Sequence, residues 1–252
     1  MTRAQIKTLL DSHVARHETE ATISETSPDP ILIPRHYRTH ESALIAALFS
    51  YGNVRAIMGF LKALDLSVLH EEEAVIKHTL SKAYYRFQTP EDVTALFIAL
   101  RRLLTQGSLE AHFLSGYQKG HDVLEGIGAL IRALDKAYPY ESRGYRFLLG
   151  TAPDPANPAG SPLKRWNMFV RWMARNRTPD LGWWPSVDPA RLIVPLDTHT
   201  FRVSRNLGLL TRKSCDLKAA LALTKSLRRF DPVDPVKYDF ALFRLGLEKG
   251  VR

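Results

Sequence analysis

The spacing of apolar residues constrains the fold of this chain more than any other feature. Apolar side chains recur at intervals of three and four along most of its 252 residues, as in residues 91–105, where Val93, Leu96, Phe97 and Leu100 share one helical face. No segment alternates apolar and polar residues long enough to predict a β-strand. The sequence therefore predicts an all-α protein.

Two irregular segments rich in proline, residues 24–34 and 138–162, interrupt this helical pattern. Because proline cannot continue a helix from its interior, such segments separate packed units. We expect a helical barrel lobe at residues 40–154 and a second helical lobe formed by residues 1–39 and 155–252. A hydrophobic content of 45% over 252 residues is sufficient for one core or two.

The charge balance of the chain indicates a polyanionic partner. The formal net charge is +9, which favours nucleic acid over a membrane surface, although a solvated basic surface would give the same count. The single cysteine, Cys215, excludes an internal disulfide and a Cys-ligated metal cluster, and the nine histidines show no ligand spacing. We expect a monomeric cytoplasmic, nucleoid-associated protein that needs no metal, cofactor or membrane.

Two charged residues between positions 161 and 210 are candidates for chemistry. Ser161 and Pro162 predict the start of a helix, which puts Lys164 in its first turn. Asp197 precedes another predicted helix, which ends at Gly208. An amine and a carboxylate at two helix starts can act as a nucleophile and its partner, but both are also common helix-end charges. An Asp that only caps a helix contributes about 1 kcal/mol of stability.

The helix predicted after Ser161 has two faces. Leu163, Trp166, Phe169, Val170 and Met173 form the expected core stripe, while Lys164, Met168, Arg171 and Arg175 form another face. This arrangement predicts that Lys164 lies beside two arginines outside the core. These cations could favour the neutral amine or could bind phosphates. The following loop, residues 176–195, contains Trp183 and Trp184, and a loop of this length is usually functional when it is ordered. We expect at least one of the two tryptophans to fill a hydrophobic core instead.

Four segments carry a resemblance to a known superfamily. Residues 195–203 (PLDTHTFRV) resemble the Asp-Thr-His segment of the helix-hairpin-helix DNA glycosylases, whose Asp is catalytic. Residues 239–246 (DFALFRLG) are similar to an Ala-Leu-x-x-Leu-Gly helix of these enzymes. Residues 43–50 (ALIAALFS) look like their first core helix, which leads to a turn that fills the gap left by a flipped base. Residues 164–173 (KRWNMFVRWM) resemble a bacterial family of unassigned function within this group.

The resemblance implies a two-lobed fold and a role for each candidate residue. Asp197 matches the catalytic Asp, and Lys164 would be the lysine that forms a Schiff base with the sugar. The other residues would contact the ligand: Tyr51, Asn53, Arg165, Arg171, Arg175 and His199 would bind DNA, and Phe49, Trp183 and Trp184 would line a base pocket.

The sequence departs from the superfamily pattern in three respects: the hairpin motif, the terminal cysteines and a wider spacing between the two candidate residues. The usual hairpin motif is replaced by residues 157–164 (NPAGSPLK), and the cysteines of the iron–sulfur members are absent after Gly246. The spacing of 33 residues between Lys164 and Asp197 is similar to that of the archaeal 8-oxoguanine glycosylases, which makes an oxidised base one candidate substrate.

Three functions follow as hypotheses. The first is a DNA base-excision repair glycosylase, with abasic-site lyase activity if Lys164 attacks, acting on damaged duplex DNA. The second is a non-catalytic DNA- or RNA-binding protein of the same fold. The third is a protein-interaction scaffold whose positive charge is incidental. Steep salt dependence of DNA affinity would argue against the third.

Overall fold

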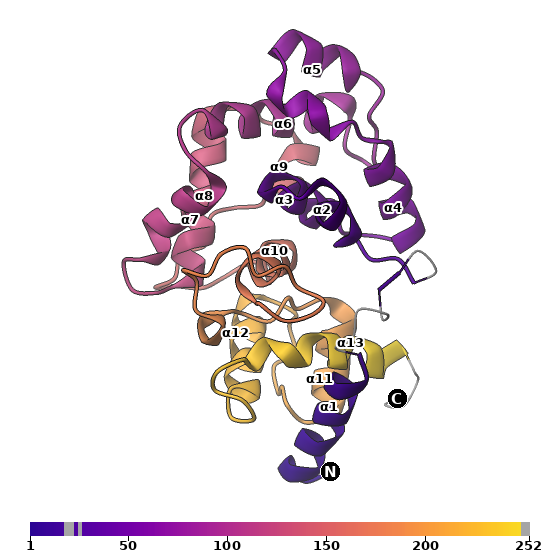
Figure 1. The fold of residues 1–252 in the computed structure, drawn as a ribbon. Helices are drawn as coiled ribbons and strands as arrows, with labels where there is room; N and C mark the ends of the chain where they lie inside the picture. Colours follow the sequence, from indigo (N-terminus) through magenta and orange to yellow (C-terminus); the bar gives the residue numbers. More distant parts are fainter. Residues whose placement is uncertain (18–22, 25–26, 248–252) are drawn as a thin grey trace. The chain divides into compact units, whose positions relative to one another are not determined.

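The computed structural model describes residues 1–17, 23–24 and 27–247 (Figure 1). Within these residues the chain forms thirteen α-helices and short 3-10 helices, and no β-strand, so the prediction of an all-α protein is confirmed. The chain divides into two compact units, which we call the central unit (Pro28–Pro155) and the terminal unit (Met1–Ser27 with Ala156–Arg252). None of the described helices has the length and apolar character needed to span a bilayer.

The central unit is a bundle of short helices. It contains α2 (Leu32–Tyr37), α3 (His40–Leu48), α4 (Val54–Ala63), η2 (Leu66–His70), α5 (Glu73–Thr79), α6 (Pro90–Leu104), α7 (Leu109–Tyr117), α8 (Val123–Ala137) and α9 (Arg143–Leu149). Helix α3 is buried from Ser42 to its last residue, as its continuous apolar run predicts.

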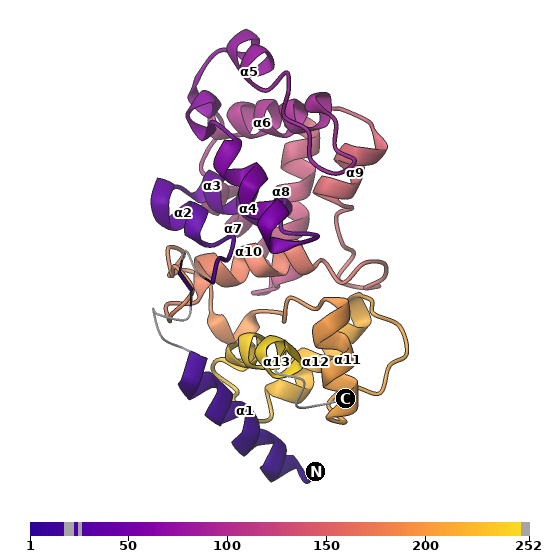
Figure 2. The ribbon, with the colours of Figure 1, turned by 90° about the vertical axis from the view of Figure 1, so that its right-hand side faces the viewer.

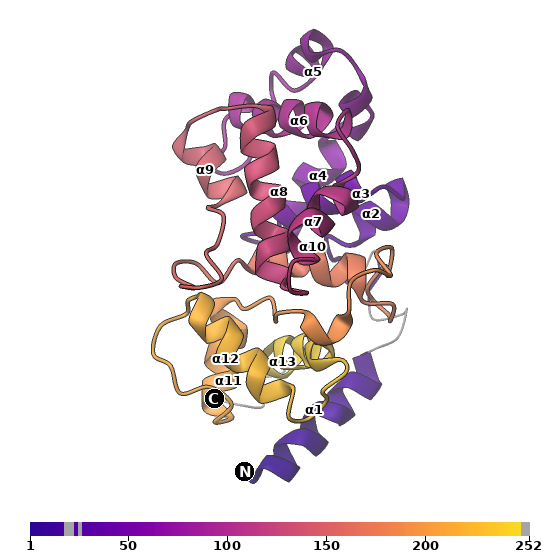
Figure 3. The ribbon, with the colours of Figure 1, turned by 90° about the vertical axis from the view of Figure 1, so that its left-hand side faces the viewer.

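Helices α7 and α8 form the closest helical pair of the central unit and lie side by side in Figures 1 and 3. Two glycines permit this approach. A Cβ atom on Gly116 would lie 2.3 Å from the Glu125 carbonyl oxygen, and one on Gly126 would lie 2.5 Å from the Phe113 ring. The pair therefore needs residues without side chains at both positions.

Local capping sets several helix starts in the central unit. Thr89 and Asp92 form a reciprocal capping box at the start of α6, with Pro90 in the first turn. Helix α9 lies within residues 138–162, which were expected to be irregular. It forms because the Ser142 side chain accepts a hydrogen bond from the Tyr145 amide (2.9 Å) and the helix buries Tyr145 and Leu148.

The terminal unit combines helices from both ends of the chain. It contains α1 (Arg3–His17), α10 (Lys164–Ala174), η3 (Pro189–Arg191), α11 (Thr198–Asn206), α12 (Leu217–Leu227), η4 (Pro235–Lys237) and α13 (Tyr238–Leu247). Helix α13 packs against α1 and α11 (Figure 2). The Tyr238 hydroxyl donates a hydrogen bond to Asp11 at 2.8 Å, which joins α13 to α1.

Helix α10 begins later than the sequence suggests. Its N-cap is Leu163 and not Ser161. Gly160 (φ 81°) and Leu163 (φ 52°) have left-handed backbone conformations, which turn the chain immediately before Lys164. The Asn167 side chain donates to the Pro162 carbonyl at 3.1 Å, and the Leu217 amide donates to the Gly160 carbonyl at 3.2 Å. These bonds hold residues 160–163 as a turn, and Lys164 becomes the first residue of the helix.

Candidate functional site

Lys164 is held at a helix start with its amine unengaged. It is the first residue of α10 and is partly buried. Within the described residues its Nζ atom has no hydrogen-bond or ion-pair partner. An ammonium at the positive end of a helix dipole is slightly unfavourable for folding, so helix stability does not account for a lysine at this position.

Asp197 is the N-cap of α11 and uses only one of its two oxygens for this purpose. Its Oδ1 atom accepts a hydrogen bond from the Thr200 amide at 2.8 Å, which confirms the capping role. Across the described part of the chain, Oδ2 has no hydrogen-bond partner. The preceding segment is fixed because the buried Val194 amide donates to the Thr224 hydroxyl at 3.0 Å. The Asp197 carboxylate is therefore held in place through Oδ1, and its Oδ2 atom is available to a ligand.

A third charged group, Asp239 on α13, is affected by the charges of both Lys164 and Asp197. Burial raises the pKa of the Asp239 carboxyl to about 6. The charge of Arg171 opposes this increase, the charge of Asp197 adds to it, and the charge of Lys164 opposes it more weakly. Arg171 of α10 pairs with Asp239, and His199 of α11 packs against Gly246 of α13. Helices α10 and α11 therefore both contact α13, and the charges of both candidates act on Asp239.

Arg171 and Arg175 do not form an exposed basic face, and the prediction that they bind DNA is corrected by their burial. Their side chains are 8% and 4% exposed. Arg171 pairs with Asp239 and, through Nε, with Asp180 at 3.1 Å.

Arg175 pairs with Asp180 at 3.1 Å and with Asp234 at 2.9 Å. The network is buried because every charge in it has an opposite partner. Burial raises the pKa of Asp180, and the two arginines oppose that increase.

His199 is a packing residue of the interface between α11 and α13. Its ring lies 5.8 Å from that of Phe243, and its Nε2 atom lies 2.1 Å from the position that a Cβ atom on Gly246 would occupy. Nε2 is buried and has no hydrogen-bond partner in the described part of the chain. Position 246 therefore needs a glycine, because a side chain there would collide with the His199 imidazole.

Arg202 is a candidate phosphate contact that the sequence alone did not single out. It is exposed on α11, and its Nη2 atom lies 3.5 Å from Nδ1 of His199. Its position one helical turn after His199 was the available signal. Arg165, the second residue of α10, is only partly buried, and its predicted DNA contact stays a prediction.

Two of the three predicted base-pocket residues belong to hydrophobic cores instead. Phe49 is fully buried in the central unit, 4.8 Å from the ring of Phe60. Trp184 is fully buried in the terminal unit, 5.2 Å from the ring of Phe169, and its backbone amide donates to Met173. Neither can wall an open base pocket. Trp183 is partly exposed, and its predicted role stays a prediction.

The turn between α3 and α4 is held by an aromatic cluster around Tyr51. The Tyr51 hydroxyl donates to the Gln88 side chain. Its ring lies 4.9 Å from that of Phe147 and 5.9 Å from that of Phe87, both of which are 43% exposed. The guanidinium of Arg86 lies over the Tyr51 ring at 5.5 Å. These contacts anchor Tyr51 in the central unit.

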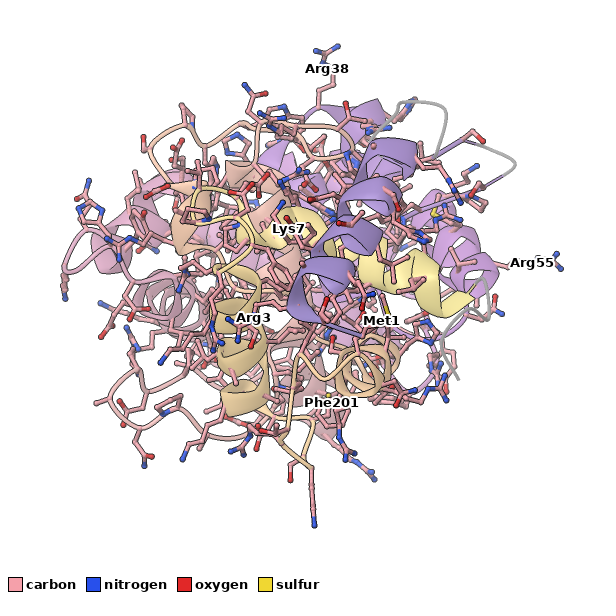
Figure 4. All side chains as sticks on the ribbon, turned by 90° about the horizontal axis from the view of Figure 1, so that it is seen from below. Met1, Arg3, Lys7, Arg38, Arg55 and Phe201 are labelled. Atoms are coloured by element: carbon pink, nitrogen blue, oxygen red, sulfur yellow. The ribbon has the colours of Figure 1, made fainter. Side chains whose placement is uncertain are left out.

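Asn53 is exposed and caps α4 by accepting a hydrogen bond from the Arg55 amide at 2.8 Å. Arg55 and Arg38 extend outward into solvent (Figure 4). Arg55 therefore presents a cation beside the turn, although Asn53 itself is engaged in capping. Its predicted DNA contact would use the amide nitrogen, which the cap leaves available.

These observations define a basic all-α protein of two compact helical units, with a lysine and a carboxylate at helix starts in one of them. The chain belongs to the family described as "Protein of unknown function (DUF2400)", whose model matches residues 29–248. Comparisons with curated proteins and with solved structures find no match. Among the described residues, no group of three or more His, Cys, Asp or Glu is placed to hold a metal ion.

Proposed function

We propose that this protein is a DNA glycosylase of base-excision repair in which Lys164 and Asp197 act on the sugar of a damaged nucleotide. The observation that carries the proposal is the contact of α10 and α11 with the same helix, α13, where one helix begins with an unengaged amine and the other with a carboxylate that has a free oxygen. Both residues lie in the terminal unit, so their common relation to α13 depends on that unit alone. The resemblance of residues 195–203 and 239–246 to helix-hairpin-helix glycosylases supports the same proposal.

The chemistry follows from the two functional groups. Departure of the base breaks the glycosidic bond, the bonding pair leaves with the base, and positive charge develops on the sugar. The Oδ2 atom of Asp197 would stabilise that charge. The neutral amine of Lys164 would bond to C1′ and lose a proton, and the C1′–O4′ bond would break with its electron pair and a proton going to O4′, which leaves a Schiff base. Loss of a proton from C2′ and departure of the 3′-phosphate would then cleave the DNA strand. The target base would first leave the duplex stack.

DNA binding would rest on charge rather than on base reading. The formal net charge is +9, and Arg202 is exposed one helical turn beyond the Asp197 cap. Phosphate contacts of this kind position a duplex without selecting its sequence, and they make affinity fall steeply with salt. The identity of the damaged base would then be decided in the pocket that receives it.

The test is base release from duplexes that carry 8-oxoguanine, uracil or thymine glycol, measured for wild type and Asp197→Asn. Asparagine caps a helix as well as aspartate does, so α11 should persist while the charge is lost. Asp122→Asn, at the cap of α8, is the matched control. We expect release by wild type and by the control, and none by Asp197→Asn. Equal release by all three proteins would refute the proposal.

A second candidate is a DNA-binding protein of this family without catalysis. The observation that favours it concerns the segment before α10. The described residues 150–163 contain no helix, so the first helix of a helical hairpin is missing at this place. The same assay separates the two functions. Salt-sensitive DNA binding by wild type without release of any base would support the non-catalytic function.

A further inference from the structure

A concave pocket lies in the central unit, at residues far from Lys164 and Asp197 in the sequence. It has a volume of about 590 Å³ and lies between α4 and residues 79–86. This volume falls within the roughly 300–1,000 Å³ typical of small-molecule sites. Gly59 and Ala63 of α4 and Asp65 line one side of it, and Lys82, Tyr84 and Arg86 line the other.

The walls of this pocket are aromatic. The rings of Phe60 and Tyr85 are stacked, with centroids 4.7 Å apart and planes 29° apart, and both residues line the pocket. Tyr84 also lines the pocket and is 60% exposed, so its ring is accessible to a ligand. Tyr85 is buried and supports Phe60, so Phe60 and Tyr84 supply the accessible aromatic surface, which suits a flat aromatic ligand.

The rim of the pocket is cationic. Lys82 and Arg86 are exposed and, among the described residues, neither has a carboxylate partner. Arg86 is held in position, because its backbone is left-handed (φ 58°), its guanidinium lies over Tyr51, and a Cβ atom on Gly52 would lie 2.2 Å from its Nη1 atom. An arginine fixed in this way can hold a phosphate with little loss of side-chain entropy.

The pocket also offers one acceptor for hydrogen-bond donors. The Oδ1 atom of Asp65 accepts hydrogen bonds from the Ser67 amide (3.0 Å) and hydroxyl (2.6 Å), and Oδ2 has no partner in the described part of the chain. A sugar hydroxyl or an exocyclic amine could donate to Oδ2. Aromatic walls, a carboxylate oxygen and fixed rim cations together match the base, sugar and phosphate of one nucleotide.

We infer that the pocket between α4 and residues 79–86 binds one unpaired nucleotide, with its base against the aromatic wall and its phosphate at Lys82 and Arg86. The nucleotide can be free or can be part of a single strand, since the chemistry is shared. Phe87 and Phe147, whose rings lie 4.7 Å apart beyond Arg86, would provide the next stacking surface for a strand. The inference does not depend on glycosylase activity.

The test measures binding of a fluorescent adenosine monophosphate and of a labelled five-nucleotide single strand by anisotropy. Gly59→Phe should fill the pocket, because a Cβ atom at this exposed position meets nothing within 4 Å and the helix can accept the side chain. Gly59→Ala is the matched control that leaves the pocket open. We expect Gly59→Phe to weaken binding at least tenfold and Gly59→Ala to bind like wild type.

A second variant tests the proposal without filling the pocket. Tyr84→Ala removes an exposed ring and should leave the fold intact, but it should weaken binding roughly fivefold or more through lost stacking. Binding of both probes assigns the site to nucleotides in general, and binding of the strand alone assigns it to single strands. Absence of binding of both probes, or equal binding by wild type, Gly59→Phe and Tyr84→Ala, would overturn the inference. Asp197→Asn should bind both probes normally, which separates this test from that of the glycosylase.

Discussion

Replacement of Arg175 by methionine tests whether the arginines of α10 stabilise the core or contact DNA. The Arg175 side chain is 4% exposed and bridges Asp180, which is 1% exposed, and Asp234, which is 14% exposed. Methionine keeps most of the volume but removes the charge. Asp180 would retain only Arg171, and Asp234 would lose its partner. Removal of one member of a buried ion pair typically costs about 3–5 kcal/mol, and we expect a loss of that size.

Urea denaturation followed by circular dichroism measures this loss, and Arg202→Met is the matched control. Arg202 is exposed, so its replacement should change the free energy of unfolding by less than about 0.5 kcal/mol. Arg202→Met should also reduce the slope of log DNA affinity against log salt concentration by about one, the change expected for the loss of one phosphate contact. The reasoning would be refuted if Arg175→Met unfolded at the wild-type midpoint and lost DNA affinity instead.

Three further predictions concern stability. Burial raises the pKa of Asp239 from 3.8 to about 6, so protonation of this group stabilises the folded state by on the order of 3 kcal/mol below pH 4, and this stability is lost as pH rises through 6. In urea titrations between pH 4 and 7, Asp239→Asn should therefore show a smaller decline in the free energy of unfolding than wild type. An unchanged decline would contradict this prediction. Gly246→Ala should cost about 1–3 kcal/mol, because its Cβ atom would meet His199, and His199→Ala in the same chain should recover part of that loss in the same denaturation assay. Thr89→Ala should cost about 1 kcal/mol by removing half of the α6 capping box, which calorimetry would detect as a lower melting temperature, whereas an unchanged melting temperature would show that the box contributes nothing.

Local sequence signals predicted those parts of the fold that depend on neighbouring residues. Asp197 was identifiable as a cap from its place before a predicted helix, and it accepts a hydrogen bond from the backbone amide three residues later, as Thr39 and Asp216 do at the starts of α3 and α12. Gly208 follows α11 with a φ of 72°, as expected for a left-handed helix stop. The all-α class followed from the spacing of apolar residues, which is likewise a local property.

The parts that sequence did not predict depend on distant partners. Arg171 looked exposed on a helical projection, but its partner Asp239 lies 68 residues further along the chain. Phe49 and Trp184 looked like pocket walls because aromatic residues serve both pockets and cores, and only packing distinguishes the two. The nucleotide pocket beside α4 had no motif, because its lining residues come from separate segments.

The measurement that tests the central proposal most directly is borohydride trapping on duplexes that carry 8-oxoguanine, uracil, thymine glycol or an abasic site. Lys164→Ala is compared with wild type and with Lys218→Ala, which alters a lysine in the first turn of α12. We predict a covalent protein–DNA adduct with wild type and Lys218→Ala on at least one lesion, and none with Lys164→Ala. An adduct that persists in Lys164→Ala would contradict the assignment of this lysine, and the absence of both adduct and base release on every duplex would contradict the proposed chemistry.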